Sequence, residues 1–157
     1  MNNQHLNIYN NLIKLTRNKS LYYNLSKDEV FSDRLVFLLI HISFFFKIYK
    51  NSNPKKVLQE IHDLIFKQIE TSIREIGYGD VSINKNMKKY VNFFYDIISK
   101  TDDWDNYNFD KKSKILINFI DRPKNISFYV DYFDKFSEFL KNNTFNYFTK
   151  DIEEFKF

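Results

Sequence analysis

Only two glycines and two prolines occur in the 157 residues of this chain. Sandwiches and barrels need many tight turns, and tight turns draw heavily on those two residue types. Their scarcity therefore argues against an all-β fold and favours long segments joined by few turns. Apolar residues make up 43% of the chain, which is enough material for a hydrophobic core. Because this length is close to that of one compact domain, we expect a single domain over residues 1–157.

Apolar residues recur at three- and four-residue steps along nearly the whole chain, which predicts an all-α fold of about six to eight helices. The expected helices cover residues 6–15, 20–25, a long segment up to residue 49, 57–76, 83–98, 111–120, 126–140 and 145–155. We expect Asp28 or Ser32 to cap the long helix, and residues 101–110 to form a loop around Trp104. The long helix is apolar on most sides, so it should lie near the centre.

The chain lacks the residues of several kinds of functional site. It has no cysteine, which excludes disulfides, thiolate metal sites and a cysteine nucleophile. Its three histidines lack partners at metal-ligand spacing, and no phosphate-binding glycine loop, nucleophile elbow or HExxH pattern occurs. We therefore expect neither a cofactor nor an enzyme. A net charge of +4 permits an anionic partner without demanding one.

No segment has the length or pattern of a membrane span or a targeting peptide. The longest apolar run, residues 35–46, is shorter than the roughly 20 residues that a transmembrane helix needs, so it should be a buried helix. The first residues show neither a secretory signal nor the Arg-rich pattern of a transit peptide. We expect the protein to be soluble in its own compartment.

Both glycines lie in one turn, between two amphipathic helices. Gly77 suits the left-handed position that ends a helix, and Asp80 or Ser82 can cap the next one. Arg74 and Asp80 could pair across the turn or contact a partner. We favour the first interpretation, in which Arg74, Gly77, Gly79 and Asp80 brace the turn.

Lys85, Lys88 and Lys89 form a cationic face at the start of the helix that follows this turn. The backbone dipole disfavours cations in the first turns of a helix, and a broken local rule often marks a functional site. We predict a partner-binding role for these lysines. The alternative is an ordinary solvated face.

His41 lies inside the most apolar segment of the chain. One interpretation is a core imidazole, hydrogen-bonded to a backbone carbonyl or a carboxylate. The other is a polar element of a partner-binding surface. Arg34 lies two helical turns earlier and shares roughly the same face, so we include both residues among the predicted partner-binding residues. An ion pair at the helix start is the simpler role for Arg34.

Residues 72–96, SIREIGYGDVSINKNMKKYVNFFYD, resemble the signature of the ubiquinol–cytochrome c chaperone family. The resemblance has three parts, a turn, a lysine-rich helix start and an aromatic pair. They are formed by Arg74, Glu75, Gly77, Gly79 and Asp80, then by Lys85, Met87, Lys88 and Lys89, and then by Phe94 and Tyr95.

A second block, with Tyr22, the triplet at residues 32–34 and His41, is similar to the family in order and spacing. The two blocks cover about residues 9–100. Where the family usually continues with Gly-Arg after the aromatic pair, this chain has Asp96 and Ile97. Residues 101–157 resemble the family only in helical character.

The resemblance implies an all-α assembly chaperone for ubiquinol–cytochrome c reductase, the cytochrome bc1 complex. Its expected client is newly made cytochrome b or another bc1 subunit, received near the ribosome with a small helper protein. It implies a cytoplasmic bacterial protein with peripheral contact to the inner membrane, or a matrix protein in a eukaryote. DNA is not an expected partner.

Other roles remain open alongside the chaperone. The lysine face could instead carry a ribosome- or RNA-binding adaptor, whose binding would weaken steeply with salt. A structural subunit would be present in constant stoichiometry in the finished complex. An enzyme would need a pocket with perturbed titratable groups.

Overall fold

The computed structural model describes residues 3–77 and 79–157, and within them the chain is all-α. The α-helices are α1 (Asn3–Thr16), α2 (Ser20–Tyr23), α3 (Phe31–Tyr49), α4 (Lys55–Glu75), α5 (Asp80–Thr101), α6 (Phe109–Phe119) and α7 (Ile126–Lys141). Two short 3-10 helices, η1 (Trp104–Asn106) and η2 (Phe145–Thr149), complete the described elements. The predicted fold class is confirmed.

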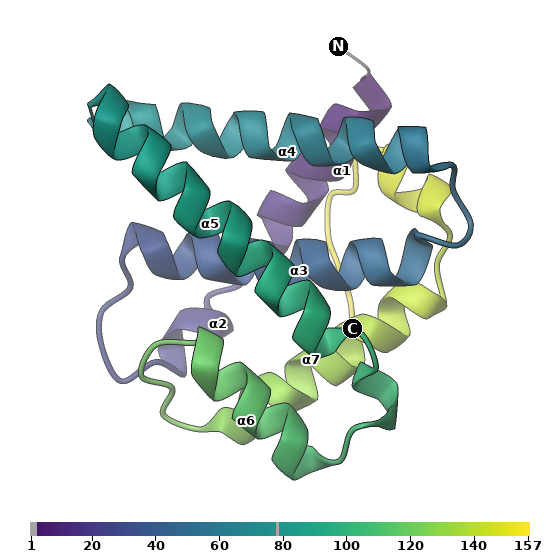
Figure 1. Ribbon diagram of the computed structural model, residues 1–157. Coiled ribbons are helices and arrows are strands. Elements are labelled where there is room, and N and C mark those ends of the chain that lie inside the picture. The colour runs from purple at the N-terminus through teal and green to yellow at the C-terminus, as the bar shows by residue number, and fades with distance from the viewer. Residues whose placement is uncertain (1–2, 78) are drawn as a thin grey trace.

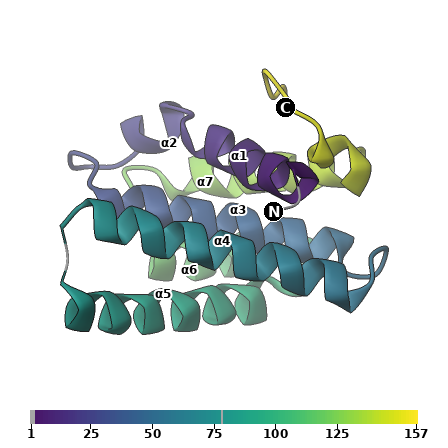
Figure 2. The ribbon, with the colours of Figure 1, turned by 90° about the horizontal axis from the view of Figure 1, so that it is seen from above.

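Helix α3 lies at the centre of the molecule, as its apolar composition predicts. Helices α1, α5 and α7 all pack against it (Figure 1). Twelve of its nineteen residues are buried, so few of its sides remain open to solvent. Seen from above, α1 and α5 lie on opposite sides of α3 (Figure 2). The two candidate sites lie on these opposite sides of α3, one beside α1 and the other on α5.

The start of α3 differs from the prediction. The helix begins at Phe31, and its N-cap is Val30 rather than Asp28 or Ser32. The buried carboxylate of Asp33 accepts a hydrogen bond from the Val30 backbone N–H at 2.9 Å and pairs with Lys27. The carboxylate at the third helical position thus satisfies the backbone donor of the N-cap residue itself, which is the N3 half of a capping box.

The segment around Trp104 contains more helix than the predicted loop. Helix α5 continues to Thr101, and Trp104 lies fully buried in η1. Its indole Nε1–H donates a hydrogen bond to Asp134 of α7 at 2.8 Å. The buried indole therefore fixes the connection between α5 and α6 onto the core.

The predicted C-terminal helix over residues 145–155 is largely wrong. Only η2 is helical, and the residues after Thr149 run extended across α1. The buried Asn11 side chain donates to the carbonyls of Phe148 and Lys150 at 3.0 and 2.7 Å, and accepts from the Ile152 N–H at 3.2 Å. These tertiary bonds replace the local bonds that a helix would have made.

We predict that Asn11→Ala lowers the free energy of unfolding by about 2 to 3 kcal/mol, because it leaves buried backbone groups of residues 148–152 without partners. Chemical denaturation followed by circular dichroism measures this change. The neighbouring Asn10 is exposed, so Asn10→Ala is the matched control and should stay within about 0.5 kcal/mol of the wild type. Equal effects of the two substitutions would contradict the role given to Asn11.

Candidate functional site

The α4–α5 turn is braced by Arg74, as predicted. The Arg74 guanidinium donates hydrogen bonds to Asp80 at 2.8 Å and to Glu70 at 3.1 Å. These bonds, that to Asp80 first, raise the pKa of Arg74. Asp80 is the first residue of α5, and Gly79 occupies the N-cap, so neither Asp80 nor Ser82 caps the helix. The Asp80 carboxylate instead ties the start of α5 to the end of α4.

The two glycines of this turn have different roles. Gly77 has a φ of +99°, the left-handed region in which side chains with a Cβ are strained, so the prediction for it is confirmed. Gly79 has an ordinary φ of −73°, and a Cβ placed there would meet no atom within 4 Å. Residue 78 lies outside the described residues. Glu75, the last residue of α4, is exposed beside the turn.

The lysine cluster lies on the outer side of α5. Lys85, Lys88 and Lys89 are all exposed, and none has an ion-pair partner among the residues that the structure describes. Val81 and Tyr95 are 85% and 53% exposed. They lie seven residues before and after Lys88, and therefore on the same helical stripe. We call Val81, Lys85, Lys88, Lys89 and Tyr95 the α5 outer face.

His41 is fully buried, with its ring among the aromatic side chains of α7. Its Nδ1 lies 2.6 Å from the Phe37 carbonyl oxygen, which can only accept, so Nδ1 carries the proton. Nε2 therefore accepts a hydrogen bond from the Tyr132 hydroxyl at 2.7 Å. Burial lowers the pKa of His41 to about 4, so the imidazole is neutral near pH 7.

This position corrects the prediction that His41 contributes to a partner-binding surface. A ring without solvent exposure cannot touch a partner in this conformation, and the structure matches the core interpretation instead. Arg34 is exposed near the start of the same helix, where its guanidinium lies 3.5 Å from Glu29 and 5.8 Å from the centre of the Phe31 ring. The ion pair expected for it is present. Arg34 and His41 therefore form no common surface.

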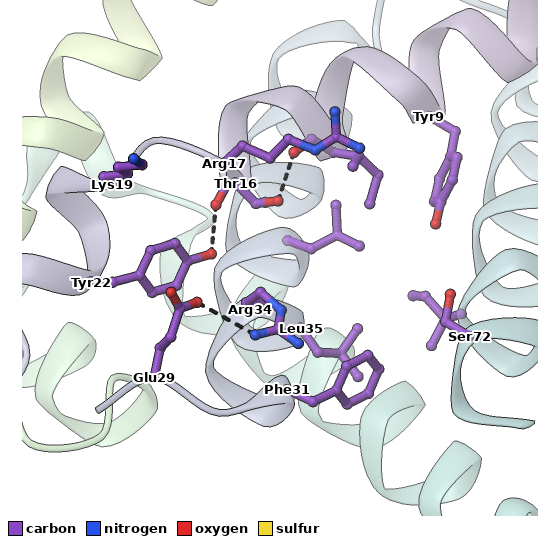
Figure 3. A pocket seen from close by; sticks show the side chains of 13 residues that line it. Tyr9, Thr16, Arg17, Lys19, Tyr22, Glu29, Phe31, Arg34, Leu35 and Ser72 are labelled. Carbon is purple, nitrogen blue, oxygen red and sulfur yellow. Dashed lines mark hydrogen bonds and ion pairs between the residues drawn. The ribbon is translucent and has the colours of Figure 1, made fainter. Parts of the chain in front are cut away.

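Arg34 lines a cavity of about 450 Å³ that the sequence did not predict. Figure 3 shows Arg17, which follows the end of α1, and Arg34 of α3 beside the cavity, with Tyr9 and Ser72 across it. The cavity arises where α1 and α2 meet α3 and α4. The full lining is Tyr9, Ile13, Thr16, Arg17, Lys19, Tyr22, Glu29, Phe31, Arg34, Leu35, Leu38, Ile69 and Ser72. No local pattern in the sequence marks Tyr9 or Arg17 as part of a site, because only tertiary packing brings them to Arg34.

The described residues contain no group of three His, Asp or Glu side chains placed to hold a metal ion. Within the same residues, no helix is long and apolar enough to cross a membrane.

The candidate sites of this all-α protein are therefore an exposed helix face and a cavity, both of which are suited to binding. The model of the family described as Ubiquinol-cytochrome C chaperone matches residues 25–116, which is more than half of the chain. The chain belongs to this family, as the resemblance of its motifs predicted. The family assignment implies a role as an assembly chaperone for the bc1 complex and a non-enzymatic function.

The matched segment begins after α2 and ends inside α6. It includes every residue predicted to bind a partner or to form the motif turn. Tyr22 lies outside it, so the N-terminal part of the expected 9–100 range is not covered. Neither the curated proteins nor the solved structures contain a match to this chain.

We predict that Gly77→Ala lowers the free energy of unfolding by about 1 kcal/mol, because alanine is strained at the left-handed φ of this position. Gly79→Ser is the matched control and should be neutral or slightly stabilising, since serine is favoured at an N-cap and has room there. Urea denaturation of the three proteins distinguishes the two glycines. A loss at Gly79 equal to that at Gly77 would contradict this assignment.

We predict a pH dependence of stability that originates from His41. The folded pKa of about 4 lies below the 6.5 of an unperturbed histidine, so protons bind the unfolded chain more tightly. Stability from this group is complete above about pH 6.5 and declines as the pH falls toward 4. Between about pH 7 and pH 5 the loss should be about 2 kcal/mol.

The test compares urea denaturation of the wild type with that of the His41→Phe/Tyr132→Phe double variant at both pH values. The double variant removes the imidazole without leaving the Tyr132 hydroxyl unpaired. All ionisable groups other than His41 and Tyr132 are common to the two proteins, so only the difference reports on His41. An identical pH dependence in the two proteins would show that His41 does not titrate as described.

Proposed function

We propose that this chain is a chaperone that holds newly made cytochrome b, or another bc1 subunit, through the α5 outer face. The observation that carries the proposal is the composition of that face. Exposed Val81 and Tyr95 share one stripe with Lys88, and Lys85 and Lys89 flank it. Exposed apolar side chains with cations between and beside them suit a hydrophobic segment of a membrane protein whose polar ends carry acidic side chains.

The position of α5 supports this use. Its inner side is anchored to the core by Ile83, Tyr90, Phe94 and Ile97, which are all buried. Helix α5 packs against α3, α4 and α6, so it is held rigidly while its outer side stays open. A preorganised face loses little conformational freedom when a client binds.

Tighter binding of the unassembled client than of the assembled one would make the chaperone bind and release its client in a fixed order, without any chemical step. A client segment that is exposed before assembly and buried afterwards binds the chaperone only in the unassembled state. Incorporation of the subunit into the complex would then release the chaperone. We expect a small helper protein and contact with the membrane surface to assist this step, as the family resemblance implies.

A ribosome- or RNA-binding adaptor is the second candidate. One observation favours it: among the described residues, no carboxylate pairs with Lys85, Lys88 or Lys89. Three phosphate contacts would lose roughly 20- to 40-fold in affinity when salt rises from about 50 to about 200 mM. An apolar client interface should change little over the same range.

We predict that Lys85→Glu/Lys88→Glu/Lys89→Glu reduces the capture of cytochrome b or another bc1 subunit about tenfold or more, because charge reversal repels acidic client segments. The measurement is a crosslinked pull-down of the tagged full chain from cells that assemble the bc1 complex, with circular dichroism to verify folding. Lys114→Glu/Lys124→Glu/Lys150→Glu is the matched control. These lysines are exposed, and their side chains have no ion-pair partner among residues 3–77 and 79–157.

Capture by the wild type and the control, but not by the α5 variant, would support the proposal. Recovery of ribosomes without any bc1 subunit, lost between about 50 and 200 mM salt, would favour the adaptor. Equal capture by both triple variants would rule out the α5 outer face as the client site.

A further inference from the structure

The cavity beside Arg34 has walls of two distinct kinds. Ile13, Leu35, Leu38 and Ile69 give it an apolar interior. Its charged lining residues are Arg17, Lys19 and Arg34 against the single carboxylate of Glu29. The cavity therefore combines an apolar interior with a net positive charge.

Three hydroxyl groups of the lining, those of Tyr22, Thr16 and Ser72, already donate hydrogen bonds within the protein. Tyr22 donates to the Thr16 carbonyl at 2.5 Å, and Thr16 donates to the Ile13 carbonyl at 2.7 Å. Ser72 donates to the Gln68 carbonyl at 3.0 Å. Because these donors are in use, a ligand entering the cavity would find mainly apolar contacts in its interior.

The cations, in contrast, are available. Arg34 pairs with Glu29 at 3.5 Å, but about half of each side chain is exposed, and such pairs hold weakly. Arg17 and Lys19 have no carboxylate partner in the part of the chain that the structure describes. Arg17 follows the end of α1, Arg34 belongs to α3, and both side chains line the same cavity (Figure 3). A guanidinium group favours a carboxylate or phosphate as its partner.

We propose that this cavity binds a single-chain anionic amphiphile, with its alkyl chain in the apolar interior and its carboxylate or phosphate at Arg17 and Arg34. A volume of about 450 Å³ lies within the range of small-molecule sites. A client helix with side chains is about 10 Å across and needs an open groove instead. The site goes beyond client holding and uses none of the residues of the α5 outer face.

The first test is calorimetric titration of the purified full chain with three probes. Dodecanoate, below its micelle concentration, has both parts of the ligand, dodecanol has only the tail, and inorganic phosphate has only an anionic head. We expect saturable binding of one dodecanoate per chain, at least about tenfold weaker binding of dodecanol, and no measurable binding of phosphate. This comparison needs no variant, so a folding defect cannot obscure it.

The second test uses paired variants. Arg17→Gln/Arg34→Gln should weaken dodecanoate binding about tenfold and leave dodecanol binding unchanged. Lys114→Gln/Lys124→Gln removes the same amount of charge elsewhere on the surface and should change neither. Ile13→Trp should fill the interior and abolish binding of both chains, with circular dichroism and thermal unfolding to verify that the fold is intact.

Vesicles distinguish a free amphiphile from a lipid headgroup in a bilayer. Binding to phosphatidylglycerol vesicles without binding of dodecanoate would make the arginines a membrane contact and overturn the proposal. Equal affinity for dodecanoate and dodecanol, or equal losses in the two glutamine variants, would also overturn it. A failure to capture bc1 subunits has no bearing on these outcomes, so the two proposals can fail separately.

Discussion

The burial of α3 is the constraint on which the rest of the structure depends. A helix that is apolar on nearly every side must be surrounded, so α1, α5 and α7 are placed around it. Its one buried imidazole, His41, would be costly there without partners. The Phe37 carbonyl and the Tyr132 hydroxyl supply both hydrogen bonds, and the second of these fixes α7 against α3. A polar group thus specifies how two apolar helices meet.

The same constraint moves the candidate sites to the periphery. With the sides of α3 occupied, only its first turns and the outer sides of its neighbours remain open. Arg34 lies at that start, beside the cavity, and the exposed lysines lie on α5, away from its buried side. The Arg74–Asp80 pair ties the start of α5 to the end of α4, close to those lysines. This ion pair and the buried inner side of α5 together position the α5 outer face.

Local patterns predicted most of the helices because each has its own periodic apolar face and few breakers interrupt it. Gly77 could be assigned from sequence because a left-handed helix end has a strong residue preference. The C-terminal segment could not, because the bonds that replace its helix come from Asn11, far away in sequence. The role of His41 could not be decided from the sequence for a related reason. Helical periodicity places His41 on one face of the helix, but it does not show whether another helix covers that face. The cavity could not be predicted from the sequence, because Arg17 and Arg34 come to line the same space only in the folded chain.

The family match covers the α5 outer face completely and the cavity only in part. Residues 25–116 contain α3, α4, α5 and most of α6, and so the whole α5 outer face. They lack α1 and α7, which cover α3, so the matched part leaves much apolar surface of its central helix uncovered. The cavity straddles this boundary, with Arg34 inside the match and Arg17 outside it. The α5 outer face, the proposed client site, therefore lies wholly inside the family match, whereas an amphiphile site that needs both arginines extends beyond it.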